Sequence, residues 1–146
     1  MVQRVREARV SVAGAEIARM GCGLLALVGV GHADDEAHAR ELARRLVQLR
    51  VLPDAQGRMN RSLLESGGTL GVVSQFTLFG DARHGRRPSY GEAAPAERAE
   101  PLVACVVEAA RAQGVPVVTG RFGAEMQVTL VNSGPVTLLL DTEKRF

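Results

Sequence analysis

Sulfur-containing and aromatic side chains are scarce among the 146 residues, which include two cysteines, no tryptophan, one tyrosine and four phenylalanines. Cys22 and Cys105 form no CxxC pair and have no neighbouring histidine, so we expect two small buried apolar residues and neither a disulfide nor a metal site. Aromatic residues make up 3% of the chain, too few for the stacking platform of a single-strand binder.

Long apolar runs are also missing, since none approaches the ~20 residues of a membrane-spanning helix. The first six residues carry charge and lack the apolar region of a secretory signal peptide. These two absences predict a cytoplasmic protein.

Motifs of conventional hydrolytic sites are absent. His32, His38 and His84 have no HExxH or His-Cys spacing, so we expect no metal and no other cofactor. Gly-x-Ser-x-Gly is missing as well, although a Ser-His-Asp triad stays open because its members need be close only in space. If the chain hydrolyses a substrate, main-chain donors, hydroxyl groups and the substrate itself are the expected agents.

Positive charge comes almost entirely from arginine, and Lys144 is the only lysine. The net charge is +2 and the isoelectric point is about 8.9. Arginine suits phosphate contacts, but a general arginine bias explains this composition equally well, so it permits an RNA partner without demonstrating one. A polar loop containing Arg83, Arg86 and Arg87 is a candidate site for a phosphate backbone, although such loops are more often only solvated.

The hydrophobic pattern predicts one α+β domain covering residues 1–146, with mixed, largely antiparallel sheets and two main helices. We expect a helix that begins at Asp34 or Asp35 and ends before Pro53, and a second helix over residues 95–113 with Gly114 as its cap. Pro101 should make the second helix begin near Glu100 or kink there. Expected strands cover residues 3–12, 17–20, 23–30, 69–77, 115–120, 126–132 and 136–140, with 23–30 at the centre of the sheet and 141–146 as a loosely ordered charged tail.

Two polar stretches interrupt apolar runs. Residues 132–137 read Asn-Ser-Gly-Pro-Val-Thr, and the pair Gly134 and Pro135 favours a rigid turn that presents main-chain atoms; a hairpin turn is the plainest interpretation. Residues 74–77 read Ser-Gln-Phe-Thr at a predicted strand end, where alternation would place Ser74 and Phe76 on one face and Gln75 and Thr77 on the other.

Together these stretches resemble the D-aminoacyl-tRNA deacylase (D-tyrosyl-tRNA deacylase) family, whose signatures are SQFTL and NxGPVT. The resemblance covers nearly the whole chain and is carried by Gln3-Arg4-Val5, Gly23-Leu24-Leu25, Gly57-Arg58-Met59-Asn60, Ser74 to Leu78, Arg87-Pro88-Ser89, Gly120-Arg121-Phe122, Met126-Gln127-Val128 and Asn132 to Thr137.

The resemblance implies a cytoplasmic homodimeric editing enzyme that cleaves the ester between a D-amino acid and the 3′-terminal ribose of tRNA. It leaves open whether glycine mischarged on tRNA is also removed. It further implies that a cis Gly134-Pro135 pair reaches into the partner's pocket beside residues 74–77 and rejects L-amino acids, that Arg4 steadies this turn, and that Phe122 and Met126 lie near the terminal adenosine.

Two mechanisms follow for the implied reaction. In one, the ribose 2′-hydroxyl assists hydrolysis while residues 74–77 supply oxyanion-hole donors, mainly main-chain N–H groups. In the other, Thr77 is a covalent nucleophile, although no base is visible beside it.

Three positions depart from the family pattern, namely Arg9, Tyr90 and Pro101, and they put local geometry in doubt more than activity. Two rival interpretations remain: a non-catalytic, nucleic-acid-binding dimeric module that uses the arginine loop, and a structural dimerisation domain, which would leave Ser74, Gln75 and Thr77 without a purpose.

Overall fold

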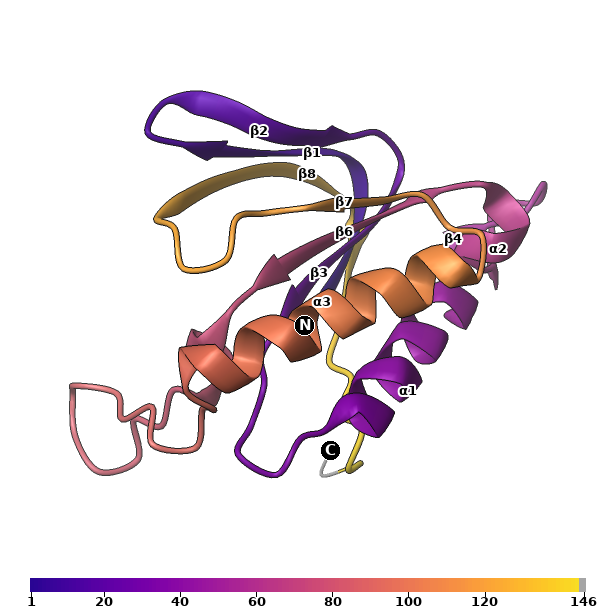
Figure 1. Cartoon of the computed structure of the whole chain (residues 1–146). Helices are drawn as coiled ribbons and strands as arrows, with labels where there is room; N and C mark the ends of the chain where they lie inside the picture. Colours follow the sequence, from indigo (N-terminus) through magenta and orange to yellow (C-terminus); the bar gives the residue numbers. More distant parts are fainter. Residues whose placement is uncertain (145–146) are drawn as a thin grey trace.

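The computed structural model describes residues 1–144, and its main feature is a six-stranded sheet with two long helices on one face (Figure 1). The sheet contains β1 (Val2–Val12), β2 (Ala15–Met20), β3 (Gly23–Val28), β6 (Thr69–Ser74), β7 (Val117–Thr119) and β8 (Met126–Leu138). The long helices are α1 (Glu36–Gln48) and α3 (Ala96–Ala112). Smaller elements are a pair of strands, β4 (Leu52–Pro53) and β5 (Met59–Arg61), helix α2 (Leu63–Ser66) and the 3-10 helix η1 (Phe76–Phe79). No helix in residues 1–144 is long and apolar enough to cross a membrane.

Strand β1 organises the sheet because it pairs with three other strands. Its first half is antiparallel to β3 and its second half to β2, while β8 pairs antiparallel along the opposite edge of both halves. On the other side of β3, strands β6 and β7 add in parallel. The strand order is therefore β2-β1-β3-β6-β7 with β8 beside β1, and the predicted α+β fold with a mixed sheet is confirmed.

Local residues cap the start of α1 and the end of α3. Asp35 accepts a hydrogen bond from the His38 backbone N–H (3.1 Å), which satisfies one of the free donors at the start of α1. The predicted ion pairs one turn apart on α1 are present: Arg40 with Glu36 is exposed, whereas Arg45 with Glu41 is half-buried. Helix α3 ends at Ala112, and Gly114 just beyond it adopts a φ of +87° and donates its N–H to the Arg111 carbonyl (2.9 Å), as expected for the glycine of a helix C-terminus.

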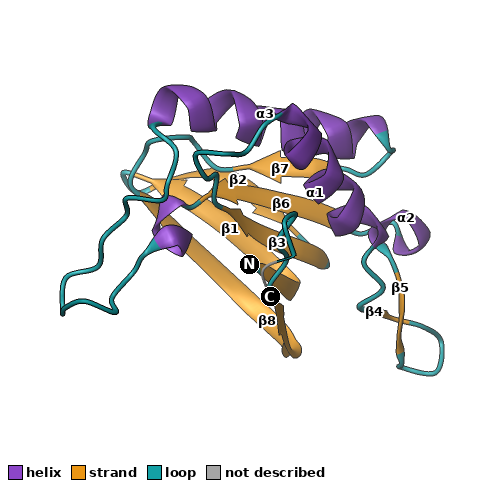
Figure 2. Ribbon diagram, turned by 90° about the horizontal axis from the view of Figure 1, so that it is seen from below, coloured by secondary structure: helices purple, strands orange, loops and turns teal. Residues whose placement is uncertain are grey.

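The alternating side chains of β3 divide the core into two layers. Leu24, Ala26 and Val28 point toward α1 and α3 and join the larger cluster, which also contains Leu46 and Val106. Leu25 points to the opposite face and packs in a second cluster with five other buried residues, Val5, Ala8, Val10, Met20 and Val73. The prediction that this strand is central and buried on both faces is confirmed (Figure 2).

The predicted hairpin turn at residues 132–137 is wrong. Asn132 pairs with Val5 and Thr137 pairs with Gln3, so both flanking runs belong to one strand, β8, and run in the same direction along β1. Four residues of β8, 133–136, stand opposite the single residue Arg4. The segment is therefore a large bulge that pushes Gly134-Pro135 out of the edge strand, and the bulge uses the same residue types as a hairpin.

Three smaller expectations need comment. Helix α3 covers Ala96–Ala112, which confirms the span predicted over residues 95–113, and it contains Pro101 instead of beginning near Glu100. A kink at Pro101 stays a prediction. Cys22 is exposed and Cys105 is half-buried, so neither is the buried apolar residue expected, and both thiols are free. The start of the tail is tied to the body because Arg45 donates to the Asp141 carbonyl (2.8 Å); residues 145–146 lie outside the described part of the chain.

Glycine at position 23 is required by the close approach of β3 and β6. A Cβ built there would lie 1.9 Å from the Thr69 carbonyl oxygen, and backbone cannot yield as a flexible side chain can. We expect Gly23→Ala to lower the free energy of unfolding by about 3 kcal/mol in urea denaturation. Gly21→Ala is the matched control, because its Cβ would meet no atom within 4 Å, and similar losses in both variants would contradict the prediction.

Candidate active site

The Ser-Gln-Phe-Thr stretch changes backbone direction halfway along. Ser74 is the last residue of β6 and pairs with Val28, the last residue of β3; beyond that point Gln75 donates its N–H to the Val28 carbonyl (2.7 Å) and η1 begins at Phe76. The strand predicted to reach residue 77 therefore ends at Ser74, and the expected alternation of faces does not hold for Phe76 and Thr77. No neighbouring strand continues past this point to hold an extended chain.

A cavity of about 510 Å³ lies beside this strand end. Five of the predicted site residues line it, namely Ser74, Gln75, Phe76, Phe122 and Met126. The other walls are small or apolar and come from the segment after β3, the start of α3, the loop before β8 and β8 itself: Val30, Val73, Ala94, Ala96, Ala99, Gly123, Ala124 and Val128. Sequence reasoning missed these wall residues, because alanine and glycine at helix starts and in loops carry no chemical signal of their own.

Among residues 1–144, none of those that line the cavity has an ionisable side chain. Its polar groups are the Ser74 hydroxyl, the Gln75 amide and the main chain. Thr77 does not line the cavity in the single chain, but its hydroxyl is tied to it through a hydrogen bond donated by the Gln75 side-chain amide. An amide N–H cannot accept a proton, so this contact orients the Thr77 hydroxyl without activating it as a nucleophile.

Arg4 holds the bulge that contains Gly134-Pro135. Its Nε donates to the Ser133 carbonyl (3.0 Å) and its Nη1 to the Val51 carbonyl (2.8 Å), so one guanidinium joins the bulge to the segment after α1. The Gly134-Pro135 peptide bond is cis, as the resemblance implies. Gly134 has a φ of +124°, and a Cβ there would lie 2.8 Å from the Arg4 Nη2. Position 134 therefore excludes a side chain through both its backbone angles and its contact with Arg4.

Within one chain, the bulge and the cavity are far apart. None of the residues lining the cavity comes from the Gly134-Pro135 bulge or from Arg4. Met126, in the cavity, pairs with Val12 near one end of β1, whereas Asn132 pairs with Val5. The six-residue separation along an extended strand is roughly 20 Å, so the two signature stretches do not form one site in a single chain.

The arginine loop projects from the body of the protein (Figures 1 and 2). Paired main-chain hydrogen bonds between Asp81 and Ser89, both 2.8 Å, close its base. Arg83 is engaged by Asp81, and hydrogen bonds from the side chain and then the N–H of Arg83 lower the pKa of Asp81 to about 2. The lowered pKa means that Asp81 carries its negative charge throughout the neutral range, so it can pair with Arg83 there. Arg86 and Arg87 are exposed in the same loop.

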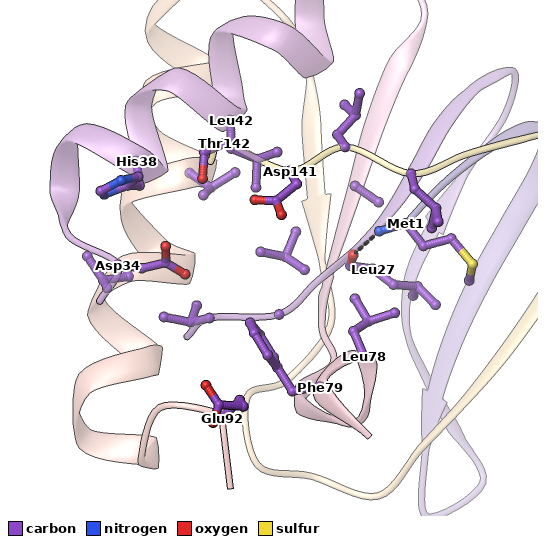
Figure 3. Close-up of a pocket in the computed structure, with 18 of the residues that line it drawn as sticks. Met1, Leu27, Asp34, His38, Leu42, Leu78, Phe79, Glu92, Asp141 and Thr142 are labelled. Atoms are coloured by element: carbon purple, nitrogen blue, oxygen red, sulfur yellow. Dashed lines mark hydrogen bonds between the residues drawn. The ribbon is translucent and has the colours of Figure 1, made fainter. Parts of the chain in front are cut away.

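A second and larger cavity, of about 880 Å³, lies elsewhere, between α1, η1 and residues 139–142 (Figure 3). His38 and Asp34 lie at the α1 side and Asp141 at the tail side, while the Met1 amino group, whose pKa burial lowers, donates to the Leu27 carbonyl (2.9 Å). Arg83 is the only predicted site residue in its lining. We therefore assign the candidate site to the smaller cavity, which gathers five of them.

Comparison with known proteins identifies the class to which this fold and site belong. Residues 1–141 match the D-Tyr-tRNA(Tyr) deacylase family, and the chain belongs to that family. It is 56% identical to the D-aminoacyl-tRNA deacylase of Thermomicrobium roseum over 97% of this chain and 92% of the relative. It is 53% identical to the D-aminoacyl-tRNA deacylase of Symbiobacterium thermophilum over 100% and 97% of the two chains.

Solved structures agree on the fold. A c-Myc DNA unwinding element binding protein superposes with a TM-score of 0.89 at 34% identity, covering 96% of this chain and 95% of the other. A probable eukaryotic D-amino acid tRNA deacylase superposes with a TM-score of 0.75 at 16% identity over 92% and 93%, a likeness of fold alone. The resemblance stated from the sequence is thus confirmed.

Because the cavity lacks ionisable groups, none of the three histidines should be needed for catalysis. We expect the triple variant His32→Asn, His38→Gln and His84→Asn to keep kcat/KM within about threefold of the wild type in hydrolysis of the ester of a D-aminoacyl-tRNA. Thermal unfolding is the control, since the His38 ring accepts a hydrogen bond from the Asp35 N–H (3.3 Å) at the start of α1. A loss of two or more orders of magnitude in a folded triple variant would restore the triad hypothesis.

Proposed function

We propose that this chain is a tRNA-editing hydrolase that cleaves the ester of D-aminoacyl-tRNA and works as a homodimer. The observation that carries the proposal is the family match over residues 1–141, together with D-aminoacyl-tRNA deacylases more than 50% identical over nearly the whole chain. Hydrolysis adds water across the bond between the acyl carbon and the ribose oxygen. The products are a free D-amino acid and tRNA with its 3′-terminal hydroxyl restored.

The proposed dimer unites the two signature stretches. One chain offers a cavity with Ser74 and Gln75, and the bulge of the partner chain would bring Gly134-Pro135 into it. Two observations support this: Gly134-Pro135 carries no reactive side chain, and within one chain no residue of the bulge lines the cavity.

Chirality can be read by the main chain in such an arrangement. An enzyme that accepts many D-side chains and rejects every L-residue cannot depend on contacts with the side chain. It must instead hold the ammonium group and Cα, and rigid backbone carbonyls do so without recognising what Cα carries. In our proposal Gly134-Pro135 supplies these carbonyls, and Arg4 keeps them in position through the Ser133 carbonyl.

The chemistry we propose relies on the substrate and on main-chain donors. Phe122 and Met126 would contact the terminal adenosine, which places the ester near Ser74 and Thr77. The ribose 2′-hydroxyl next to the ester would then assist the attacking water, since the cavity lining offers no side-chain base. The contact between Gln75 and the Thr77 hydroxyl favours this mechanism over a covalent ester on Thr77.

The test of the proposed function is ester loss from D- and L-aminoacyl-tRNA carrying the same amino acid. We expect fast loss of the D-ester and loss of the L-ester at the uncatalysed rate. Glycyl-tRNA is a third substrate in the same assay, because an achiral residue presents no L-side chain for the pocket to reject.

A non-catalytic nucleic-acid-binding dimer is the second candidate, because one structural relative at 34% identity is described as a DNA unwinding element binding protein. The same assay separates the two functions. Tight tRNA binding with no ester loss from either enantiomer would favour the binding module.

Gly134→Ala should abolish most D-ester cleavage without unfolding the protein. The new Cβ would sit on a residue with a φ of +124°, which strains any side chain, and would lie 3.1 Å from the Val136 backbone nitrogen and 2.8 Å from the Arg4 guanidinium, so we expect the backbone of the bulge to shift. A displacement near 1 Å at a reacting centre costs on the order of 100-fold in kcat/KM. Gly14→Ala is the control, since it imposes a Cβ on a φ of +79° with no atom within 4 Å.

Mixing Gly134→Ala with an inactive cavity variant tests the cross-subunit assignment. In a mixed dimer one pocket combines a sound cavity with a sound bulge, so after random exchange we expect about a quarter of wild-type activity. The cavity variant mixed with Gly134→Ala is Gln75→Ala in a first experiment and Phe122→Ala in a second. Each is used only if it is inactive by itself. No recovery after subunit exchange is verified by mass spectrometry would reject the assignment, as would a monomeric wild type.

The arginine loop should contribute to tRNA binding chiefly through Arg86 and Arg87, because Arg83 is already paired with Asp81. We expect Arg86→Gln with Arg87→Gln to weaken binding and reduce the slope of log K against log salt by about 1 to 2. Arg83→Gln should have a smaller effect. The double variant Arg40→Gln with Arg44→Gln on α1 is the control for net charge. An equal change in affinity and salt slope in this control would contradict a contact between the arginine loop and tRNA.

A further inference from the structure

Two aromatic side chains meet on the surface next to the candidate site. The rings of Phe76 and Tyr90 lie edge to face, with centroids 5.1 Å apart and an interplanar angle of 72°. In the single chain Phe76 is 54% exposed and Tyr90 is 39% exposed. The whole chain has five aromatic residues, four phenylalanines and one tyrosine, so two of the five are placed together at the surface rather than in the core. The folded chain thus gathers a small aromatic surface that the composition argued against.

The backbone around the pair holds Tyr90 in place. The paired hydrogen bonds between Asp81 and Ser89 close the arginine loop immediately before Tyr90. Gly80 leaves room for the ring, because a Cβ there would lie 3.1 Å from Tyr90 Cε1 and 3.0 Å from the Thr77 carbonyl oxygen. A further backbone hydrogen bond joins the Ala93 N–H to the Tyr90 carbonyl (3.0 Å). Tyr90 is therefore part of an ordered loop base and not of a freely moving tip.

The aromatic pair connects the candidate site with the arginine loop. Phe76 lines the 510 Å³ cavity, and Tyr90 directly follows the loop that carries Arg86 and Arg87. A ligand that leaves the cavity over Phe76 would pass the exposed rings before reaching the guanidinium groups. Exposed aromatic faces beside positive charge are the combination that binds unpaired nucleotides, with stacking for the bases and cations for the phosphates.

We propose that Phe76 and Tyr90 form a stacking site for the unpaired nucleotides that precede the terminal adenosine of the tRNA substrate. The proposal rests on the proposed function, because it assumes that the terminal adenosine occupies the cavity. Stacking would direct the 3′ strand from the cavity toward Arg86 and Arg87. Every base has a π-face, so this surface would bind the 3′ end of any tRNA without selecting among tRNA sequences.

A direct binding test uses the fact that Tyr90 is the only tyrosine and that the chain has no tryptophan. Intrinsic fluorescence therefore reports on Tyr90 alone. We expect the trinucleotide CCA to quench this emission at saturation and adenosine to leave it nearly unchanged, after correction with a parallel titration of N-acetyl-tyrosinamide. Phe76→Leu should weaken the CCA titration severalfold, since one wall of the site is then lost.

A kinetic test compares a long and a minimal substrate with the same D-amino acid. Stacking on one ring is worth about 1.4 kcal/mol or more, so Tyr90→Leu should lower the ratio of kcat/KM for D-aminoacyl-tRNA to kcat/KM for D-aminoacyl-adenosine by roughly tenfold. Tyr90→Phe is the matched control, because it keeps the ring and should leave the ratio within about twofold. Thermal unfolding and sedimentation of each variant establish that it is folded and that its assembly matches the wild type.

The outcomes separate the stacking site from its alternatives. Equal loss on both substrates would mean that Tyr90 only supports the cavity, and dissociation of the Tyr90→Leu protein would mean that the rings contact a second copy of the chain; either result overturns the proposal. Quenching by adenosine as strong as by CCA overturns it too. If the wild type cleaves neither substrate, the proposed function has failed, while the fluorescence titration still decides whether the rings bind unpaired nucleotides.

Discussion

The pairing of β1 with three strands is the constraint on which the rest of the structure depends. An extended strand has two edges. Along one edge, the first half of β1 pairs with β3 and the second half pairs with β2, while β8 pairs along the other edge. The arrangement leaves β8 at the border of the sheet, where four residues can bulge outward without disrupting a second ladder. A central strand could not contain such a bulge, because its neighbours on both sides would lose their register.

Arg4 is the residue of β1 that faces the bulge and has no pairing partner in β8, and its side chain occupies the gap that the bulge leaves in the hydrogen-bond ladder. Its guanidinium donates to the Ser133 carbonyl, which the gap in the ladder would otherwise leave to water, and it also donates to the Val51 carbonyl in the segment after α1. The bulge is therefore specified by a long-range contact between residues at opposite ends of the chain. A short side chain at position 4 could not reach both carbonyls, and lysine lacks the planar fork that bonds two acceptors in different directions.

The sequence predicted those features that depend on neighbours along the chain. Alternation and continuous apolar runs identified β1 and β3, the aspartates at 34 and 35 located the start of α1, and Gly114 located the end of α3. Features that depend on distant partners were missed. Residues 132–137 have the composition of a hairpin, and only the pairing of both flanks with β1 shows that they form a bulge.

The residues that line the cavity were likewise predicted where a local sequence pattern marked them and missed where it did not. Ser74, Gln75 and Phe76 stood out as a stretch that interrupts an apolar run, whereas Phe122 and Met126 were named only through the family resemblance, and the fold gathers all five around one cavity. Its alanine walls, Ala94, Ala96 and Ala99, could not be named, because their importance lies in the side-chain atoms that they lack. Likewise, the predicted strand extended to residue 77, three residues too far, because the apolar pattern continues into η1. Strand β6 ends at Ser74 because its neighbouring strand ends there, which the local pattern does not reveal.

A cavity lined without ionisable groups limits how substitutions in its lining can change substrate selection. Substrate selection cannot depend on a charged pair in this lining, and a substituted side chain would change volume or polarity rather than proton transfer. The elements that carry geometric information are instead backbone: the end of β6, the first turn of η1 and the bulge in β8. Backbone is positioned by the whole fold, so precise selection at such a site requires a rigid sheet rather than a few well-chosen side chains. The tight contact of β3 with β6 at Gly23 and the clamp of Arg4 on Ser133 are therefore as much part of the site as the residues that line it.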